Sequence, residues 1–490
     1  MMVSINYRAE AGIKIDSPDR LNPRQDPITS LKTLHLTSHP HFMKTLIPRI
    51  PKAWRALATV PFLGLSLSTG CSQSAPPPPP VHYQVVTNFD HQGSNPTGLG
   101  QGRDGNLYGT FQEGGRRWEG VVFRVKPDGS GYSVVYDFGK KSDLAEAQWP
   151  QGVLEGTDGA LYGTTRLGGT PAGGEFASGC GIVFKVNRDG SGYQVLHRFS
   201  LSPNDGAAPW SGLVEDPAGV LYGTTLQGGA HGGGVVFRLN RDGTSFTILH
   251  HFLESENDGG RPMAGLLYGS DGVLYGTTDS GGNSGPRNGT VFCINPDGTG
   301  YRVLHSFPSK AGDGRSPRAV LVEGPDHMLY GTTCDGGRMD GGTVFRMGKD
   351  GSRFQVLHRF NGSPEMTNDP TGKIETTLNG VTVMSALDSD GGSPMSLVFG
   401  KEGLLYGFTE NRGKNGVGTL FRIQSDGQGF ETLHHFLAVD GDGKDPAGRL
   451  VRGSDGAVYG LTINSETNNF SSLYRLSPLP IQPSTHPAEK

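Results

Sequence analysis

Three tryptophans and two arginines are the side chains of this sequence best suited to hold a ligand. Trp118, Trp149 and Trp210 stand outside every repeated pattern, and Arg116 and Arg117 come just before the first of them. Tryptophan offers a flat apolar platform and arginine a forked donor, a combination that suits sugar rings or peptide chains. The alternative is that these rings only fill gaps in the packing. The sequence therefore predicts a glycan or protein ligand near these five residues.

Carboxylates recur in a second pattern, in which Asp-Gly is followed by two residues and then Pro. Such an Asp caps its own turn and the Pro fixes the chain that follows, although a ring of carboxylates holding a cation is the functional alternative. In one loop Asp440, Asp442 and Asp445 have a spacing loosely like that of a calcium loop, but the later bidentate Glu is missing. Calcium is thus the only cofactor that the sequence suggests. The five aspartates are Asp205, Asp258, Asp313, Asp390 and Asp442.

No catalytic motif is recognisable in the sequence. There is no Gly-x-Ser-x-Gly elbow, no His-Glu-x-x-His and no phosphate-binding loop. Five histidines do occupy matching positions of a repeat, and a structural role is favoured over a metal site because repeated units hold them apart. They are His197, His250, His305, His358 and His434.

The elements that must position these side chains come from a repeat of about 50 residues. An apolar residue followed by Tyr-Gly, usually with Thr next, occurs seven times, and so does a strand-like phrase that ends in Phe. Self-similarity at this period indicates a solenoid or a propeller. Each unit contains four short strands, here called A to D in chain order, separated by turn residues. The Tyr-Gly pairs begin at Tyr108, Tyr162, Tyr222, Tyr275, Tyr330, Tyr406 and Tyr459.

The ends of the repeat region predict how the ring closes. The segment Tyr83 to Phe89 is a lone D strand, whereas the last unit stops after its C strand at residues 471–476. Joining the two completes a blade and removes exposed sheet edges. We therefore predict an all-β fold, a seven-bladed β-propeller of four-stranded antiparallel blades over residues 83–478, closed three strands to one. A 76-residue step between Tyr330 and Tyr406 marks an insertion, in which residues 374–387 are expected to form a hairpin.

The strand order also predicts where function lies. The long D–A and B–C loops must emerge on one face of the propeller and the tight A–B and C–D turns on the other. Binding residues concentrate on long loops. Trp118, Trp149 and Trp210 all fall on or beside such loops in three consecutive blades, so a single sector of the long-loop face is expected to bind the ligand.

The N-terminal region predicts export. Basic residues precede the apolar run 56–70, which ends in small residues before Cys71 and is typical of a secretory signal. It resembles the bacterial lipoprotein signal, although Ser68 departs from the usual Leu. That resemblance implies lipid attachment at Cys71 and an outer-membrane or cell-surface location, with ordinary cleavage as the alternative. The signal is assigned to residues 43–70, with translation starting at Met43 and residues 1–42 not made. A proline-rich linker covers 71–82 and a disordered tail 479–490.

Charge and cysteine content limit the binding partners and the covalent links that we expect for this protein. The net charge of −4 gives no electrostatic basis for nucleic-acid binding, and a lipid anchor is the only membrane contact expected. We expect a monomer. Cys180, Cys293 and Cys334 remain after Cys71, so either one disulfide joins Cys293 to Cys334 or all three are free buried thiols.

The repeats resemble the GloVer tandem-repeat family of bacterial surface and secreted proteins. The resemblance rests on Leu161-Tyr162-Gly163-Thr164-Thr165 and on residues 342–346 with 354–360, and it extends over about residues 83–476. It implies a surface protein with an anchor and brings no catalytic residues. The expected function is therefore a non-enzymatic binding or scaffold propeller. The alternative is a carbohydrate-active enzyme, a lyase or glycosidase, with its site at the mouth of the central channel.

Overall fold

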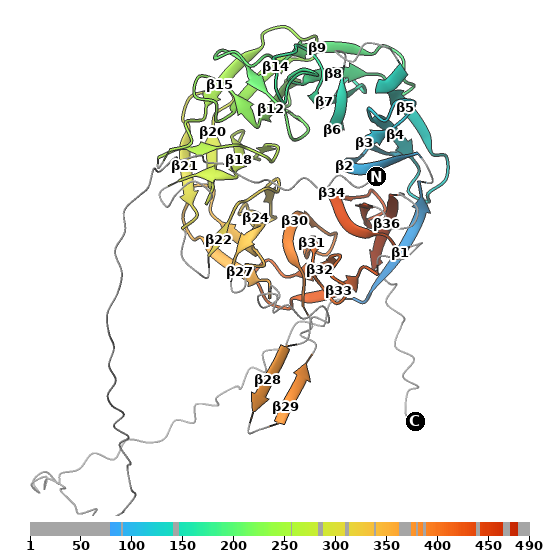
Figure 1. Ribbon diagram of the computed structural model, residues 1–490, viewed down its shortest axis with the longest axis vertical. Coiled ribbons are helices and arrows are strands. Elements are labelled where there is room, and N and C mark those ends of the chain that lie inside the picture. Colours follow the sequence, from blue (N-terminus) through green and yellow to red (C-terminus); the bar gives the residue numbers. More distant parts are fainter. Residues whose placement is uncertain are drawn as a thin grey trace, which may run out of the picture. The chain divides into compact units, whose positions relative to one another are not determined.

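Seven four-stranded antiparallel sheets surround a central axis (Figure 1). The prediction of an all-β, seven-bladed propeller is confirmed. A three-residue 3-10 turn, η1 (Phe138–Lys140), interrupts the strands, and within the part of the chain described here no helix is long and apolar enough to cross a membrane. The computed structural model describes residues 79–89, 92–140, 147–255, 257–282, 288–308, 313–337, 340–361, 374–378, 381–385, 389–437, 442–463 and 471–478.

Each blade uses its first strand at the centre and its last strand at the rim. The A strands are β2 (Gly93–Gln101), β6 (Gln148–Glu155), β11 (Val214–Glu215), β17 (Leu267–Tyr268), β23 (Val322–Glu323), β30 (Gly392–Phe399) and β34 (Lys444–Arg452). The B strands are β3 (Leu107–Gly114), β7 (Leu161–Leu167), β12 (Val220–Thr225), β18 (Leu274–Thr278), β24 (Leu329–Thr333), β31 (Leu405–Asn411) and β35 (Val458–Ile463).

The outer half of each blade follows the same order. The C strands are β4 (Val121–Val125), β8 (Ile182–Val186), β14 (Val235–Asn240), β20 (Thr290–Ile294), β26 (Thr343–Met347), β32 (Thr419–Ile423) and β36 (Ser472–Pro478). The D strands are β5 (Ser133–Asp137), β9 (Gln194–Arg198), β15 (Thr247–His251), β21 (Arg302–Ser306), β27 (Gln355–Arg359), β33 (Glu431–His435) and β1 (Val81–Asn88).

Short two-stranded ladders add to three of the blades. They join β10 (Gly206–Ala207) to β13 (Gln227–Gly228), β16 (Gly259–Gly260) to β19 (Ser280–Gly281), and β22 (Gly314–Arg315) to β25 (Asp335–Gly336). The insertion carries the expected hairpin, formed by β28 (Ile374–Leu378) and β29 (Val381–Ser385).

Strand β1 closes the ring as predicted. It pairs antiparallel with β36 from Val81 opposite Pro478 to Asn88 opposite Ser472, and so supplies the fourth strand of the last blade. The strand begins two residues before the predicted start of the propeller at Tyr83. Phe89, which follows it, is buried with its ring 5.2 Å from the rings of both Phe111 and Phe123. The closure therefore joins the last blade to the core of the first.

The Tyr-Gly phrase of strand B has a packing role in every blade. The Tyr162 hydroxyl donates to Asp158 of the preceding turn at 2.7 Å, and the other six tyrosines bond to the matching carboxylate. Burial and this bond raise the pKa of Tyr162 to about 12. The Gly makes room for an aromatic ring, since a Cβ on Gly276 would lie 2.4 Å from the ring of Phe292. In the second blade a neighbouring backbone comes equally close, since a Cβ on Gly163 would lie 2.5 Å from the Gly152 carbonyl oxygen.

On the tight-turn face, carboxylates tie neighbouring blades together. Glu323 at the end of β23 accepts hydrogen bonds from the Ser270 backbone N–H of the previous blade at 2.8 Å and from the Ser270 hydroxyl at 2.5 Å. The Lys349 ammonium lies 2.8 Å from the same carboxylate. Burial opposes ionisation of Glu323, but these partners outweigh it and lower its pKa from 4.5 to about 2.

This inter-blade link predicts a defined acid dependence. A carboxyl whose pKa is lower in the folded state stabilises the fold above its unfolded pKa and loses that contribution as the pH falls toward 2. Glu323→Gln should therefore lower the free energy of unfolding by about 2 kcal/mol at neutral pH. Urea unfolding of both proteins should show this difference shrinking steadily below about pH 4.5. A difference that stays constant down to about pH 2 would contradict this account of Glu323.

Several sequence predictions fall on residues that the structure does not describe. Residues 1–42, the signal 43–70, the lipid site Cys71, the linker up to residue 78 and the tail 479–490 all lie outside the described residues. The three remaining cysteines are within them. Cys180, Cys293 and Cys334 are free and buried, so the thiol alternative holds and the disulfide between Cys293 and Cys334 does not form.

Candidate site at the mouth of the central cavity

The seven blades share an unusual backbone in or just before the A strand. One residue per blade, never glycine, directly precedes a proline and has a positive φ between 47° and 59°. Positive φ is uncommon for residues with a side chain, and a following proline restricts the backbone further. We call these residues the mouth ring, because they stand where the A strands enter the central cavity. They are Asn95, Trp149, Ala208, Arg261, Ser316, Ser393 and Asp445.

Six of the seven mouth-ring residues, all except Asn95, are held by a described hydrogen bond to the blade before them. The Trp149 N–H donates to the Glu119 carbonyl at 3.0 Å, and the Asp445 N–H donates to the Val417 carbonyl at 3.0 Å. Ala208, Arg261, Ser316 and Ser393 make the same bond to their preceding B–C loops. The backbone is thus symmetric while the side chains include an aromatic, a cation and an anion. Strained backbone held in place by its surroundings is typical of ligand sites.

Two of the predicted tryptophans meet around an arginine. The Arg166 guanidinium carbon lies 4.0 Å from the centre of the Trp210 ring and 5.5 Å from the centre of the Trp149 ring. Both contacts lie within the range of cation–π attraction. Trp149 is a mouth-ring residue and Trp210 lines the central cavity, so this cluster stands at the cavity rim. The structure therefore brings together Trp149 and Trp210, and adds Arg166, which sequence reasoning missed.

Trp118 lies in the same sector but apart from this cluster. Its side chain is 54% exposed, so it does not fill a gap between blades. The next residue, Glu119, carries the carbonyl that binds the Trp149 N–H. The Glu119 carboxyl is buried, which raises its pKa. Trp118 is thus linked to Trp149 through one backbone hydrogen bond, with no contact between the rings described.

The two predicted arginines differ in their surroundings. The Arg116 side chain is exposed, with Nε 3.9 Å from a carboxylate oxygen of Asp137, and its backbone N–H donates to the same oxygen at 3.2 Å. Arg117 is exposed, and its backbone lies beside Gly139 of η1. Both precede Trp118 on the B–C loop of the first blade. No contact described places either arginine against the Trp149–Arg166–Trp210 cluster.

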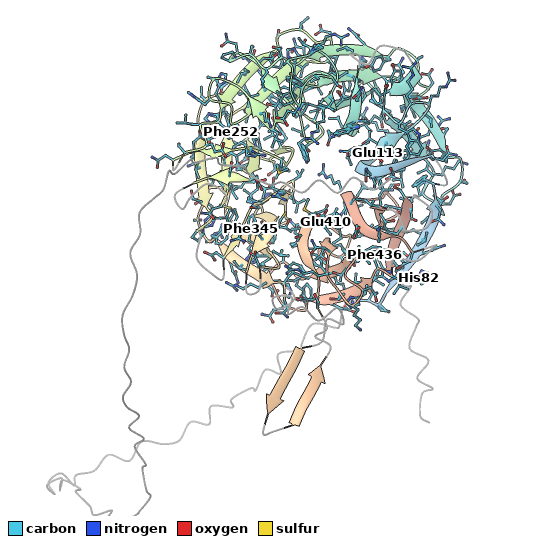
Figure 2. All side chains as sticks on the ribbon, viewed as in Figure 1. His82, Glu113, Phe252, Phe345, Glu410 and Phe436 are labelled. Carbon is cyan, nitrogen blue, oxygen red and sulfur yellow. The ribbon has the colours of Figure 1, made fainter. Side chains whose placement is uncertain are left out.

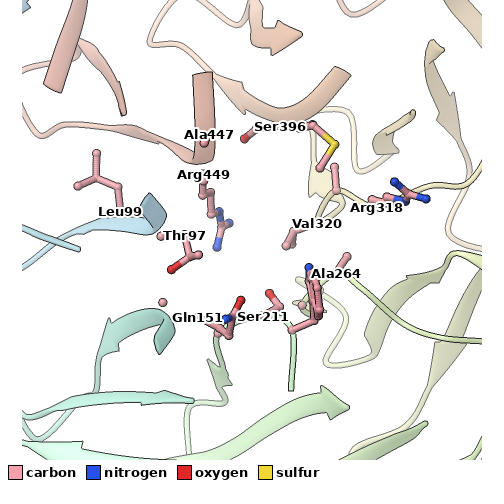
Figure 3. A pocket seen from close by; sticks show the side chains of 18 of the residues that line it. Thr97, Leu99, Gln151, Ser211, Ala264, Arg318, Val320, Ser396, Ala447 and Arg449 are labelled. Atoms are coloured by element: carbon pink, nitrogen blue, oxygen red, sulfur yellow. The ribbon is translucent and has the colours of Figure 1, made fainter. Parts of the chain in front are cut away.

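The central cavity has a volume of 410 Å³ and is lined in all seven blades by residues of the A strand or of the segment that leads into it (Figure 3). One lining position per blade directly precedes the apolar residue that lies opposite the strand-B glycine or against it. We call this set the axis ring. It consists of Gly98, Gly152, Gly212, Gly265, Val320, Ser396 and Arg449. Arg449 is the charged member, and Figure 3 shows its side chain reaching into the cavity toward Gln151 and Ser211.

Two carboxyls and a further arginine stand nearer the mouth. Burial raises the pKa of Glu410, and the neighbouring Asp445 raises it further. Burial also raises the pKa of Asp445. Arg318 lines the cavity, but its Nε is held 2.7 Å from an Asp279 carboxylate oxygen. Carboxyls with raised pKa in a cavity are candidates for proton transfer.

Four aspartates of the predicted calcium loop and carboxylate ring have side-chain partners within the protein. The Asp442 carboxylate is engaged by the His434 ring at 2.9 Å and by the Leu437 N–H at 2.8 Å, and Asp440 lies outside the described residues. Asp205, Asp258 and Asp390 bond in the same way to His197, His250 and His358 of the D strands. These carboxylates therefore cap turns and anchor histidines, as the structural interpretation predicted. In the described part of the chain, no group of three His, Cys, Asp or Glu residues is placed to hold a metal ion.

Comparison with known proteins agrees with this repeat architecture. The family model named Gloeobacter/Verrucomicrobia repeat matches residues 170–385 and 373–485, which is more than half of the sequence. The chain belongs to the Gloeobacter/Verrucomicrobia repeat family. The resemblance seen in the sequence is thereby confirmed.

Matches to individual proteins add little for this Gloeobacter/Verrucomicrobia repeat protein. No curated protein matches it. Among solved structures, the PQQ-bound aldose sugar dehydrogenase of Streptomyces coelicolor is 13% identical, with a TM-score of 0.39, and 82% of this chain and 100% of that one are covered. The nidogen/laminin complex has a chain 16% identical, with a TM-score of 0.38 and coverages of 57% and 93%. Similarity at this level carries no inference about activity.

One sequence signal could have revealed the site residues that were missed. The position four residues after the Tyr of the repeated phrase differs in every blade of this repeat protein. Its members include Arg166, which meets the tryptophans, Asp279, which holds Arg318, and Glu410. In these three blades, a residue of the candidate site thus lies four residues after the repeated Tyr. Arg449 carried no comparable signal, because the spacing from the strand's proline to this position differs among blades.

Proposed function

We propose that the protein is an exported, surface-anchored, non-enzymatic binding propeller that holds a glycan at the rim of its central cavity. The observation that carries the proposal is the stack of Arg166 between Trp149 and Trp210 beside the cavity. Both indole rings are only partly buried. Exposed apolar ring faces suit the weakly polar faces of sugar rings, and arginine donors suit hydroxyl groups. The apolar run before Cys71 supports export and a lipid anchor on a monomeric protein.

A second candidate function rests on the carboxyls at the mouth. Glu410 and Asp445 have raised pKa values and lie close enough for Asp445 to raise the pKa of Glu410. Glycoside hydrolysis uses two carboxyls, one of them protonated to act as an acid. This arrangement favours a glycosidase or lyase as the alternative to simple binding.

The proposal predicts a specific loss of glycan binding. A glycan array should identify ligands of the purified protein, and the double variant Trp149→Ala, Trp210→Ala should raise the Kd for them at least tenfold, which is about 1.4 kcal/mol. The reason is the loss of both ring platforms. The control is Val134→Ala on the outer strand β5, which removes an exposed apolar side chain away from the cavity.

The same samples separate binding from catalysis. Incubated glycans should be recovered intact if the protein only binds them. Shortened or unsaturated products that disappear with Glu410→Gln would replace the binding proposal with the enzymatic one. Unchanged affinity of the double tryptophan variant, with cooperative unfolding preserved, would remove the rim cluster as the glycan site.

A further inference from the structure

The axis ring breaks its symmetry at one position. Four of its seven members are glycine, and Val320 and Ser396 are small and uncharged. In the last blade the axis-ring position is Arg449, and Figure 3 shows its side chain projecting into the cavity. Glycine in the other blades leaves open space beside the guanidinium. The long cationic side chain is therefore not needed to complete the ring.

The Arg449 guanidinium has no countercharge built into the protein. Within the described residues, no hydrogen bond or ion pair reaches it, whereas Arg318 has Asp279 and Glu410 interacts with Asp445 and Arg318. The Arg449 side chain is exposed to the open cavity, although the protein packed around that cavity lowers its pKa. A cation that lines a concave site without a countercharge attracts anions, because the low-dielectric walls focus its field. A negatively charged group that enters the cavity would pair with it.

The rest of the cavity can accept such a group. The Ser396 hydroxyl oxygen accepts the Leu450 N–H at 3.1 Å, which leaves its own hydrogen free to donate. Gln151 and Ser211 lie across the cavity from Arg449 (Figure 3). The volume of 410 Å³ falls within the range of sites for small molecules, about 300–1,000 Å³. Trp210 belongs both to this lining and to the rim cluster, so the two regions are continuous.

We propose that Arg449 is an anion-binding residue and that the ligand of this site is an acidic saccharide, whose carboxylate or sulfate group enters the cavity from the long-loop face. Arginine matches such groups because its parallel N–H donors bind two oxygens at once. The identity of the ligand as a saccharide rests on the proposed function. The anion site itself rests on Arg449 alone and on the cavity around it.

The test uses ion and sugar probes on the purified protein. Glucuronate, glucose and inorganic sulfate are titrated by calorimetry into the wild type, Arg449→Gln and the control Arg198→Gln, which removes an exposed arginine at the end of β9. We expect saturable binding of glucuronate and sulfate, no binding of glucose at the same concentrations, and at least a tenfold loss of affinity for both anions in Arg449→Gln. A melting temperature of Arg449→Gln at or above that of the wild type would show that the variant is folded.

These titrations also distinguish the anion site at Arg449 from the proposed glycan-binding function. Equal anion binding by Arg449→Gln and the wild type, or no saturable anion binding by the wild type, would overturn the role of Arg449. Neutral glycans bound through the tryptophans would then leave the proposed function intact. Sulfate binding that depends on Arg449, in a protein that binds no saccharide, would instead retain the anion site and overturn the proposed function. Preference for glucuronate over sulfate identifies the carboxylate as the recognised group, and the reverse identifies the sulfate.

Discussion

Deletion of residues 81–89 should abolish the cooperative unfolding of the propeller, or lower its melting temperature by more than about 10 °C. Strand β1 pairs with β36 along seven residue pairs, so its loss leaves the whole edge of the last blade without hydrogen-bond partners. It also removes Phe89, whose ring packs on Phe111 and Phe123 of the first blade. Loss of a buried Phe costs about 3–5 kcal/mol on its own.

The deletion can be tested for its cause as well as its effect. A synthetic peptide of residues 79–89, added in excess, should restore a cooperative transition by filling the open edge, as in other cases of strand addition. His82→Ala in the intact chain is the control, because His82 is an exposed residue of the same strand. Calorimetry and light scattering report stability and aggregation. A deleted protein that melts like the wild type would show that β1 is not needed to close the ring.

Gly276→Ala should lower the free energy of unfolding by about 2–3 kcal/mol. Gly276 is the glycine of the strand-B phrase in the fourth blade, and a Cβ there would lie 2.4 Å from the Phe292 ring and 2.9 Å from Leu266. All three residues are buried in one core cluster or beside it, so the ring and the strand cannot both stay in place. Overpacking of this kind forces side chains from their rotamers.

The matched control for this glycine is Gly100→Ala on β2. Its Cβ would meet nothing closer than 3.7 Å, so the change should be neutral or slightly stabilising. Urea denaturation of the two variants against the wild type measures the difference directly. Equal stabilities for the Gly276 and Gly100 variants would mean that the Phe292 ring moves freely, and that the glycine of the repeated phrase is not explained by packing.

The fold could be predicted because the same packing problem is solved seven times. Tyr108, Tyr162 and their counterparts each fill the same place between blades, so their spacing shows the period without knowledge of any contact. The closure was equally accessible, since Tyr83 to Phe89 is a D strand with no blade of its own. Both features follow from local sequence patterns and from the number of strands, so they can be predicted without knowledge of side-chain geometry.

The site was predictable only where symmetry is broken by a rare residue. Trp149 and Trp210 stood out for this reason, and the structure brings them together. Arg449 did not, because its equivalence to Gly98 and Gly152 depends on register shifts within the A strands. Spacing alone also could not show that the His434 ring hydrogen-bonds the Asp442 carboxylate.

In the mouth ring, the constraints that fix the backbone are independent of the side chains that would contact a ligand. A proline follows each of these residues, and in six of them the N–H donates to a carbonyl of the preceding blade. Neither constraint depends on the side chain between them. Asn95, Trp149, Arg261 and Asp445 can therefore each be substituted during evolution without further changes to the fold. The propeller thus combines a constant backbone with seven variable side chains at the cavity mouth. Relatives with the same repeats should differ in ligand specificity chiefly at these seven positions.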